Sequence, residues 1–290
     1  MFRYGYEIVK ACEERGLGIS DLAWEQECEE TQQPKQQVME EMQRRIQVMH
    51  QACNTTLNKA VQSVSGLTGG DANRLHSYIA QGDSLLGAGA LRGVDFALSC
   101  FEVNTSMGAI VACPTAGSCG IVPGALFGVA EMINATPQCL QDAFATAGLI
   151  GMIIAKNATV AGAEGGCQAE CGSAAAMAAA AITQMKGGTP QQSLDAAAIA
   201  LKNVMGLVCD PVAGLVEIPC AKRNASGVAN ALLSADLVLA GIKSMIPFDE
   251  VVEAMYKVGR MLPEQLRETA KGGVATTPTG KAYKKQVFGE

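Results

Sequence analysis

The chain has 290 residues, 49% of them hydrophobic and 17% charged, a balance typical of a folded protein with a large buried core. Its net charge of −6 disfavours nucleic acid as a partner, because phosphate binding requires a basic face. Aromatic residues make up only 4% while Ala, Gly and Met are abundant, so closely packed helices are expected.

The N-terminal third predicts helices separated by glycines and a proline. Short helices are expected at residues 7–12, 20–24 and 76–80. A long helix opens after Pro34, where apolar residues recur at three- and four-residue spacing between Val38 and Ala60. This helix is interpreted as a solvated packing helix, and His50 within it as a polar surface residue.

The remaining chain also predicts helices, at residues 124–133, 141–155, 169–185 and 221–242. Thr189 and Gln192 form a capping-box pattern with Pro190 between them, which predicts another helix that runs to about residue 205. Asp249 is expected to cap a further helix, and Pro263 to begin a last short one. Since no alternating β-branched segment occurs, the predicted fold is all-α. Residues 1–275 are interpreted as one multi-helix domain and residues 276–290 as a mobile tail.

Neither targeting nor membrane insertion is indicated. Two apolar stretches, residues 143–155 and 172–182, are shorter than the about 20 residues that span a bilayer, so both are interpreted as buried helices. The N-terminus lacks a signal-peptide pattern, which favours a cytoplasmic location without a membrane partner. In such a reducing compartment, eleven cysteines indicate a metal or redox site rather than a disulfide framework.

Three cysteines stand in segments rich in glycine or proline. Cys167 lies in a glycine-rich turn before an alanine-rich helix, and Cys209 and Cys220 bound a short loop broken by prolines. Their spacing matches neither a zinc ribbon nor a four-cysteine ferredoxin run. Three thiolates that meet at helix ends suit a soft metal with one open position. Cys171 is expected to point from its helix into the core.

Polar loops provide further candidate site residues. Asn104–Gly108 leads into Cys113–Pro123, a turn-rich segment of the kind that supplies backbone N–H groups to anions, although an ordinary helix connection is the alternative. A second glycine-rich loop spans Ser65–Asp71. Cys113 and Cys119 are alternative metal ligands.

Four motifs together resemble a known family. Gly162–Glu170, Cys209–Gly214, Ile218–Asn224 and Pro114–Pro123 are similar to iron–sulfur-dependent L-serine dehydratase (L-serine ammonia-lyase), in particular to the alpha chain of its two-chain form. The resemblance covers most of residues 1–275. It implies a lyase of amino-acid catabolism and gluconeogenesis, in which β-elimination of water converts L-serine to pyruvate and ammonia.

The resemblance also implies residue roles. A [4Fe-4S] cluster would be held by Cys167, Cys209 and Cys220. Glu164 and Thr115 are candidate catalytic residues, although Glu164 could instead cap a helix. Candidate substrate contacts are Asn104, Ser106, Ser118, Arg223 and Asn224. The alternative for Arg223 is a surface helix position.

The sequence departs from the complete enzyme at the expected general base. The family's other portion carries a Ser-Ser-His-Thr segment, whereas this chain has only His50 and His76, neither in that context. A beta chain and a hetero-oligomer are therefore expected. The chain also ends in Gln286–Glu290, without the terminal cysteine that reaches the cluster in single-chain relatives.

Two other functions compete with this interpretation. A pyridoxal-phosphate dehydratase would require a Schiff-base lysine and a phosphate loop in an α/β fold, and neither is indicated. A non-catalytic metal-binding or scaffold subunit of a metabolic complex is the alternative that remains.

Overall fold

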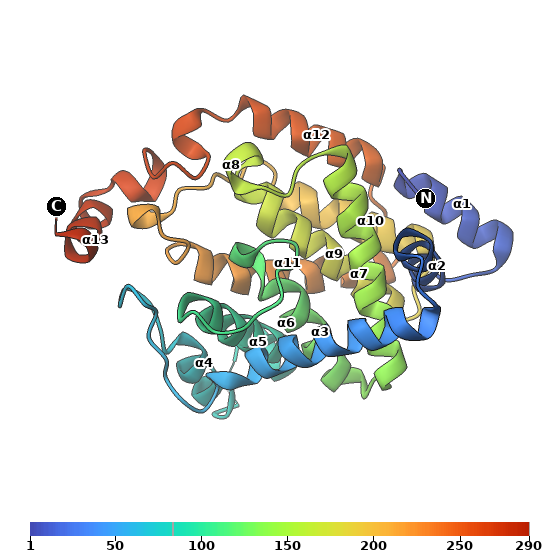
Figure 1. The fold of residues 1–290 in the computed structure, drawn as a ribbon, viewed down its shortest axis with the longest axis horizontal. Helices are drawn as coiled ribbons and strands as arrows, with labels where there is room; N and C mark the ends of the chain where they lie inside the picture. Colours follow the sequence, from blue (N-terminus) through green and yellow to red (C-terminus); the bar gives the residue numbers. More distant parts are fainter. Residues whose placement is uncertain (83, 290) are drawn as a thin grey trace.

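A computed structural model describes residues 1–82 and 84–289. These residues form thirteen α-helices joined by short 3₁₀ and π turns, and no β-strand occurs among them, which confirms the predicted all-α class (Figure 1).

Helix α9 (Ser173–Met185) is the centre of the fold. Eleven consecutive residues from Ser173 to Thr183 are buried, seven of them alanines. The helices α6 (Ile121–Ile133), α7 (Pro137–Asn157), α10 (Pro190–Asn203) and α11 (Cys220–Leu239) pack around it. Alanine side chains let these backbones approach closely, so the scarcity of aromatic residues reflects how the core is built.

The first three helices cover one side of this core. They are α1 (Gly5–Arg15), α2 (Ile19–Thr31) and the long α3 (Lys35–Thr55), which crosses the molecule below α9 in Figure 1. Both α1 and α2 extend beyond the predicted ranges, and Pro34 is the N-cap of α3. His50 is exposed, as predicted.

The predicted cap at Asp249 is wrong. Helix α12 begins one residue earlier, at Phe248, with Pro247 as its N-cap, and ends at Met261. The Asp249 carboxylate instead accepts hydrogen bonds from the backbone N–H groups of Gly5 and Tyr6, at 2.7 and 3.0 Å. It thus satisfies the free donors at the start of α1, 244 residues away in the sequence.

Helices α4 (Asp71–Ile79) and α5 (Gly87–Thr105) follow, and most of α5 was not predicted. Its glycines read as a loop in the sequence, but they serve close helix packing. A Cβ atom at Gly93 would lie 3.0 Å from the Gly124 carbonyl oxygen of α6, and one at Gly124 would lie 2.6 Å from the Gly93 oxygen. Only glycine permits this contact between the backbones of α5 and α6.

The C-terminal part includes α8 (Gly162–Gly165), the π turn η2 (Gln168–Gly172) and the 3₁₀ turns η1 (Ala116–Ser118), η3 (Val212–Gly214), η4 (Glu264–Leu266) and η5 (Gly273–Thr276). The Thr189–Gln192 capping box is confirmed at the start of α10. The tail contains a helix, α13 (Pro278–Phe288), which Thr277 caps. Mobility of residues 276–290 stays a prediction, and Glu290 lies outside the described residues.

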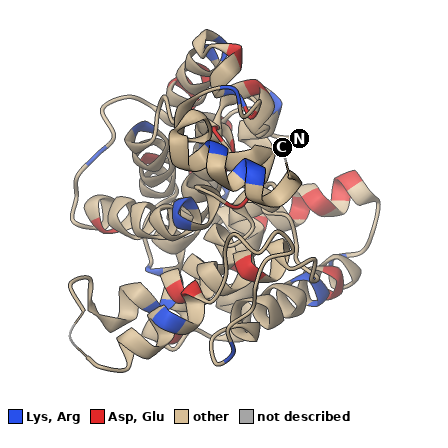
Figure 2. Cartoon of the chain, turned by 90° about the vertical axis from the view of Figure 1, so that its left-hand side faces the viewer, with Lys and Arg blue, Asp and Glu red and all other residues tan. Residues whose placement is uncertain are grey.

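Two helical segments are long and apolar enough to cross a membrane, Ala116–Ile133 and Pro137–Asn157. They are 67% and 56% buried inside the protein, respectively, as core helices are. On the face that carries α13, basic and acidic residues are interspersed along the helices (Figure 2).

Candidate functional site

The three cysteines singled out by their spacing lie in one neighbourhood, called here the thiol site: Cys167, Cys209 and Cys220. Cys167 stands between α8 and η2, Cys209 lies in the loop after α10, and Cys220 is the first residue of α11. All three are buried, at 1%, 3% and 5% exposure. The backbone of Cys209 is fixed because its N–H donates to the Leu266 oxygen and its oxygen accepts from the Glu268 N–H.

The three thiols affect one another electrostatically. Burial, reinforced by the charge of Cys167, raises the pKa of Cys220 to about 12. The pKa of Cys209 is raised by burial and then by Cys167, with Cys220 a weaker contributor. An uncharged thiol is therefore the stable form of Cys209 and Cys220, and a bound metal would have to displace their protons.

Cys167 differs from the other two because its thiolate is stabilised. A hydrogen bond with Cys171 lowers its pKa, and the charge of Arg223 lowers it further. The two sulfur atoms of Cys167 and Cys171 are 3.3 Å apart. Cys171 therefore contacts the thiol site, rather than pointing only into the core as expected. It lies in the π turn η2, a local winding that is frequent at functional sites.

Arg223 reaches into the protein from the first turn of α11. Its guanidinium donates to the Val208 oxygen and to Asp210 Oδ1, both at 2.9 Å, and it also hydrogen-bonds the Cys167 thiol. It therefore fastens the segment around Cys209 to α11 and carries a positive charge beside the thiols. The alternative of a surface position is wrong, because the side chain is only 16% exposed.

Glu170 is a mostly buried carboxylate that sequence reasoning did not select. Its Oε1 accepts a hydrogen bond from Thr115 Oγ1 at 2.9 Å, and burial raises its pKa despite this bond. Thr115 Oγ1 is in turn 3.1 Å from Ser118 Oγ. The available signal was a carboxylate three residues after Cys167, just before an alanine-rich helix.

The glycine at position 162 brings Glu170 and the thiol site together. A Cβ atom there would lie 2.7 Å from Glu170 Oε2 and 3.2 Å from Cys209 Sγ. Because both atoms lie close to the same point, the side chains of Glu170 and Cys209 are neighbours at Gly162. The glycine-rich sequence before Cys167 thus lets a carboxylate and a thiol approach the same backbone.

The asparagines and the serine predicted to contact the substrate form hydrogen bonds with nearby backbone groups. Asn224 accepts from the Gly120 N–H and donates to the Gly117 and Cys220 oxygens. Asn104 Nδ2 donates to the Ala116 oxygen at 3.1 Å, and Ser106 Oγ to the Val103 oxygen at 3.1 Å. Asn224 is fully buried, so its described bonds hold the 117–120 loop against α11.

Glu164 is in α8 and is exposed, so a role in catalysis stays a prediction. His76 Nδ1 is 2.7 Å from the buried carboxylate of Asp95, in a contact between α4 and α5.

Cys119 belongs to a second cluster, called here the core thiol group: Cys53, Cys100 and Cys119. Cys100 hydrogen-bonds with both other side chains, and all three are fully buried between α3, α5 and the turn before α6. Cys113 is 9% exposed, and burial raises its pKa to about 12. The structure thus separates Cys119 from the thiol site.

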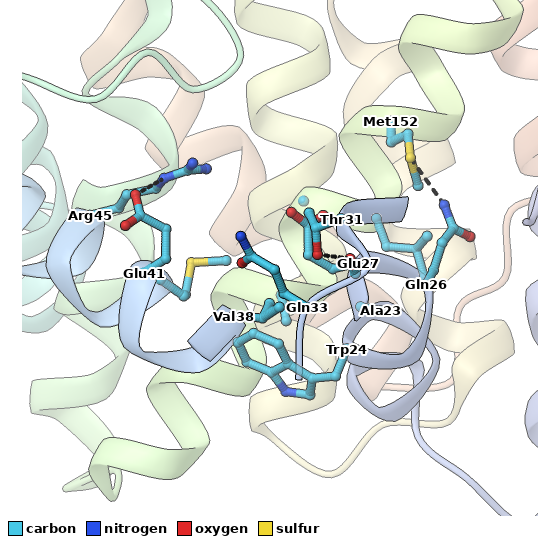
Figure 3. Close-up of a pocket in the computed structure, with 14 residues that line it drawn as sticks. Ala23, Trp24, Gln26, Glu27, Thr31, Gln33, Val38, Glu41, Arg45 and Met152 are labelled. Carbon is cyan, nitrogen blue, oxygen red and sulfur yellow. Dashed lines mark hydrogen bonds and ion pairs between the residues drawn. The ribbon is translucent and has the colours of Figure 1, made fainter. Parts of the chain in front are cut away.

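A cleft of about 340 Å³ lies between α2, α3 and α7, and Figure 3 shows its lining. Its lining includes the apolar Val38 and Leu149 and the charged Glu27, Glu41 and Arg45. None of the predicted site residues lines this cleft.

The thiol site offers an all-sulfur donor set. Within residues 1–82 and 84–289, no three His, Cys, Asp or Glu side chains are grouped so as to hold a single metal ion. Buried thiols supplied by separate turns are nevertheless the donors that iron–sulfur clusters use, and Arg223 would compensate part of their negative charge. These residues therefore fit a cluster with three cysteine ligands.

Comparisons with known proteins agree with these motifs. The family model described as "Serine dehydratase alpha chain" matches residues 14–275. A "Probable L-serine dehydratase, alpha chain" from Bacillus subtilis is 52% identical over 289 residues, covering 100% of this chain and 96% of that protein. An "L-serine dehydratase, alpha chain" from Peptoniphilus asaccharolyticus is 47% identical over 290 residues, covering 100% and 99%. The longer "L-serine dehydratase 1" of Escherichia coli is 34% identical, and 61% of it is covered.

Proposed function

The chain belongs to the serine dehydratase alpha-chain family, and from this premise we propose that it is the alpha subunit of an L-serine ammonia-lyase. The reaction removes the α-proton and the β-hydroxyl of L-serine, which leave together as water. The resulting aminoacrylate tautomerises to an imine, and water hydrolyses the imine to pyruvate and ammonia. The observation that carries the proposal is the buried thiol site beside Arg223 and Glu170. It occurs in a chain that matches, over its whole length, relatives named as alpha chains of L-serine dehydratase.

Cys167, Cys209 and Cys220 would hold a [4Fe-4S] cluster in the single domain formed by residues 1–275. Such a cluster, with three cysteine ligands, would supply a Lewis acid for the hydroxyl or carboxylate of the substrate. The protein contribution is to keep the three sulfurs in place. Three features support this role: the backbone bonds of Cys209, the start of α11 at Cys220 and the Arg223 contacts.

The chain's own polar residues would order the substrate. The Thr115 hydroxyl donates a hydrogen bond to Glu170 Oε1, so the oxygen of Thr115 can still accept a hydrogen bond from a ligand. Because burial favours the protonated form of Glu170, this carboxyl can hold a proton at Oε2 beside Gly162. Asn224 keeps the 117–120 backbone fixed, so these hydroxyls are positioned before the substrate arrives.

A partner is needed to complete the site. Asp95 already holds His76 between α4 and α5, and His50 is exposed on α3 next to Phe127. We assign the abstraction of the α-proton to a base on a beta chain, in a hetero-oligomer without nucleic-acid or membrane partners. All eleven cysteines are free thiols, which supports a reducing cytoplasmic location.

The experiment is an anaerobic reconstitution of the purified chain with iron and sulfide, assayed with and without the beta chain. We expect broad visible absorbance in the chain alone and conversion of L-serine to pyruvate only when the beta chain is added. Bound zinc without sulfide would favour the metal-binding scaffold alternative. Full turnover by the isolated chain would contradict the need for a partner.

A further inference from the structure

A second cavity, of about 470 Å³, borders the segment that leads to Cys220. Val216 and Glu217, consecutive in this segment, face opposite ways. A Cβ atom at Gly117 would lie 3.2 Å from Val216 and 3.4 Å from Glu170, on the thiol-site side. Glu217 instead lines the cavity, together with Pro219 and Lys222. Cys167, Cys209 and Cys220 do not line it, although Cys220 follows directly after the lining residues Ile218 and Pro219.

Two cations at this cavity share one carboxylate. Asp71 Oδ1 is 2.9 Å from Arg74, and Asp71 Oδ2 is in contact with Lys222. The side chains of Arg74 and Lys222 are 71% and 68% exposed, and each has further N–H donors that Asp71 does not use. Together they offer an incoming carboxylate two positively charged donors.

A buried glutamate of the same cavity uses only one of its two carboxylate oxygens in hydrogen bonds with the protein. Glu217 is only 7% exposed, and its Oε2 accepts hydrogen bonds from Ser65 and Thr68, each at 2.9 Å. Its Oε1 has no hydrogen-bond partner among the described residues. A carboxylate oxygen without a protein partner at a cavity wall can accept a hydrogen bond from a ligand's N–H group.

We propose that this cavity binds the zwitterion of a free α-amino acid, with the ammonium group on Glu217 and the carboxylate on Arg74 and Lys222. Two negative and two positive side chains line the cavity, so a zwitterion leaves the local charge balanced. An anion alone would interact only with the two positive side chains, and a cation alone only with the two negative ones. The identification of L-serine as the natural ligand rests on the proposed function, whereas the charge pattern does not.

The position of the cavity suggests how the ligand acts. Glu217 and Lys222 lie on either side of Cys220, and Glu217 also anchors the 65–68 loop. A ligand that joins these two side chains would therefore restrain the segment that carries Cys220. The site is thus a second amino-acid site whose occupancy is coupled to the order of the thiol site.

The test is calorimetric titration of the holoenzyme under anaerobic conditions with L-alanine, which has both charged groups but no hydroxyl to eliminate. Lys222→Met and Arg74→Gln should each weaken one binding component, by roughly tenfold to a hundredfold, because each removes a charged hydrogen bond. L-Lactate and ethylamine, which lack one charged group each, should not produce this component. Lys257→Met is the matched control, because Lys257 is an exposed lysine of α12 paired with Glu253.

Equal affinities in Lys222→Met, Arg74→Gln and the Lys257→Met control would overturn the proposal. So would binding of L-lactate as strong as that of L-alanine, since it would reduce the site to an anion patch. Loss of the L-serine-induced change in visible absorbance in Lys222→Met would show that the cavity is part of the reacting site instead. The titration needs no turnover, so an enzyme that forms no pyruvate would count against the proposed function alone.

Discussion

The thiol site and the core thiol group have the same donor atoms and nearly the same burial, but they are built differently. Cys53 and Cys100 lie within the long helices α3 and α5, and Cys119 in the turn before α6. Cys167, Cys209 and Cys220 stand at a π turn, in a loop and at a helix start. Side chains of α-helix interiors follow the helix packing, whereas turns can direct a side chain independently of it.

The polar neighbours of the two clusters also differ. Arg223 hydrogen-bonds Cys167, and Glu170 borders Cys209 across Gly162. The core thiols hydrogen-bond mainly with one another, and Arg92 has only a weak electrostatic effect on Cys53. Burial and cysteine count therefore do not identify a cluster site. The thiol site differs from the core thiol group in having a charged partner and a backbone that ends or turns at each cysteine.

The largest expected difference concerns cluster binding. Cys209→Ala should abolish the visible absorbance and the bound iron of the reconstituted chain, because the donor set loses one of three ligands. Cys53→Ala should retain both and lower the free energy of unfolding by about 1 kcal/mol through the small cavity that it leaves. Iron and sulfide analysis with chemical denaturation measures these quantities.

Cys171→Ala is the variant that sharpens this comparison. Cys171 contacts Cys167 but is not among the three predicted ligands. The variant should bind a normal amount of iron, but Cys167 would lose its hydrogen bond with Cys171. Normal iron content in Cys209→Ala, or loss of iron in Cys53→Ala, would reverse the roles assigned to the two clusters.

Much of this architecture was predictable from local sequence patterns. The capping box at Thr189, the proline before α3 and the apolar periodicity of α3 depend on neighbouring residues only. The structure confirms them, except that α3 ends at Thr55 instead of continuing to Ala60. The cysteine segments were recognisable from glycine and proline, and the structure gathers their three thiols. Their role as cluster ligands stays a prediction.

What could not be predicted depends on distant partners. Asp249 caps α1 instead of its own helix because tertiary packing brings Gly5 to it. The glycines of α5 looked like a loop because their partner, α6, was unknown. Glu170 was overlooked because its significance comes from Thr115, which is 55 residues away. Each of these signals lies in a contact, and a single sequence does not display contacts.

The second expected effect compares two carboxylates near Cys167. Glu170→Gln keeps an acceptor for Thr115 but removes the titratable group, and kcat should fall roughly a hundredfold with a smaller change in KM. Glu164→Gln is the matched control, because Glu164 is exposed in the preceding turn. Anaerobic kinetics on both variants, with iron content verified, measures the difference. A larger loss in Glu164→Gln would favour the role first predicted for Glu164.

The smallest expected effect is on the pH dependence of stability in the iron-free chain. Burial raises the pKa of Glu170 above its ordinary value of 4.5, so the folded state holds this proton more tightly than the unfolded state. The resulting contribution to stability is fully present below pH 4.5 and is lost as the pH rises through the folded pKa. Above that pH the wild-type chain carries a charge in a mostly buried position.

Glu170→Gln removes this charge while keeping the acceptor for Thr115. Below pH 4.5 both proteins are uncharged at this position and should melt at similar temperatures. At neutral pH the variant should melt higher by about 2–4 °C, an increase on the order of 1 kcal/mol. Thermal denaturation across this range, with Glu164→Gln as the exposed control, measures the difference. A variant that is less stable than the wild type at neutral pH, but equally stable at the lowest pH, would mean that Arg223 and Thr115 stabilise the ionised carboxylate more than burial opposes it.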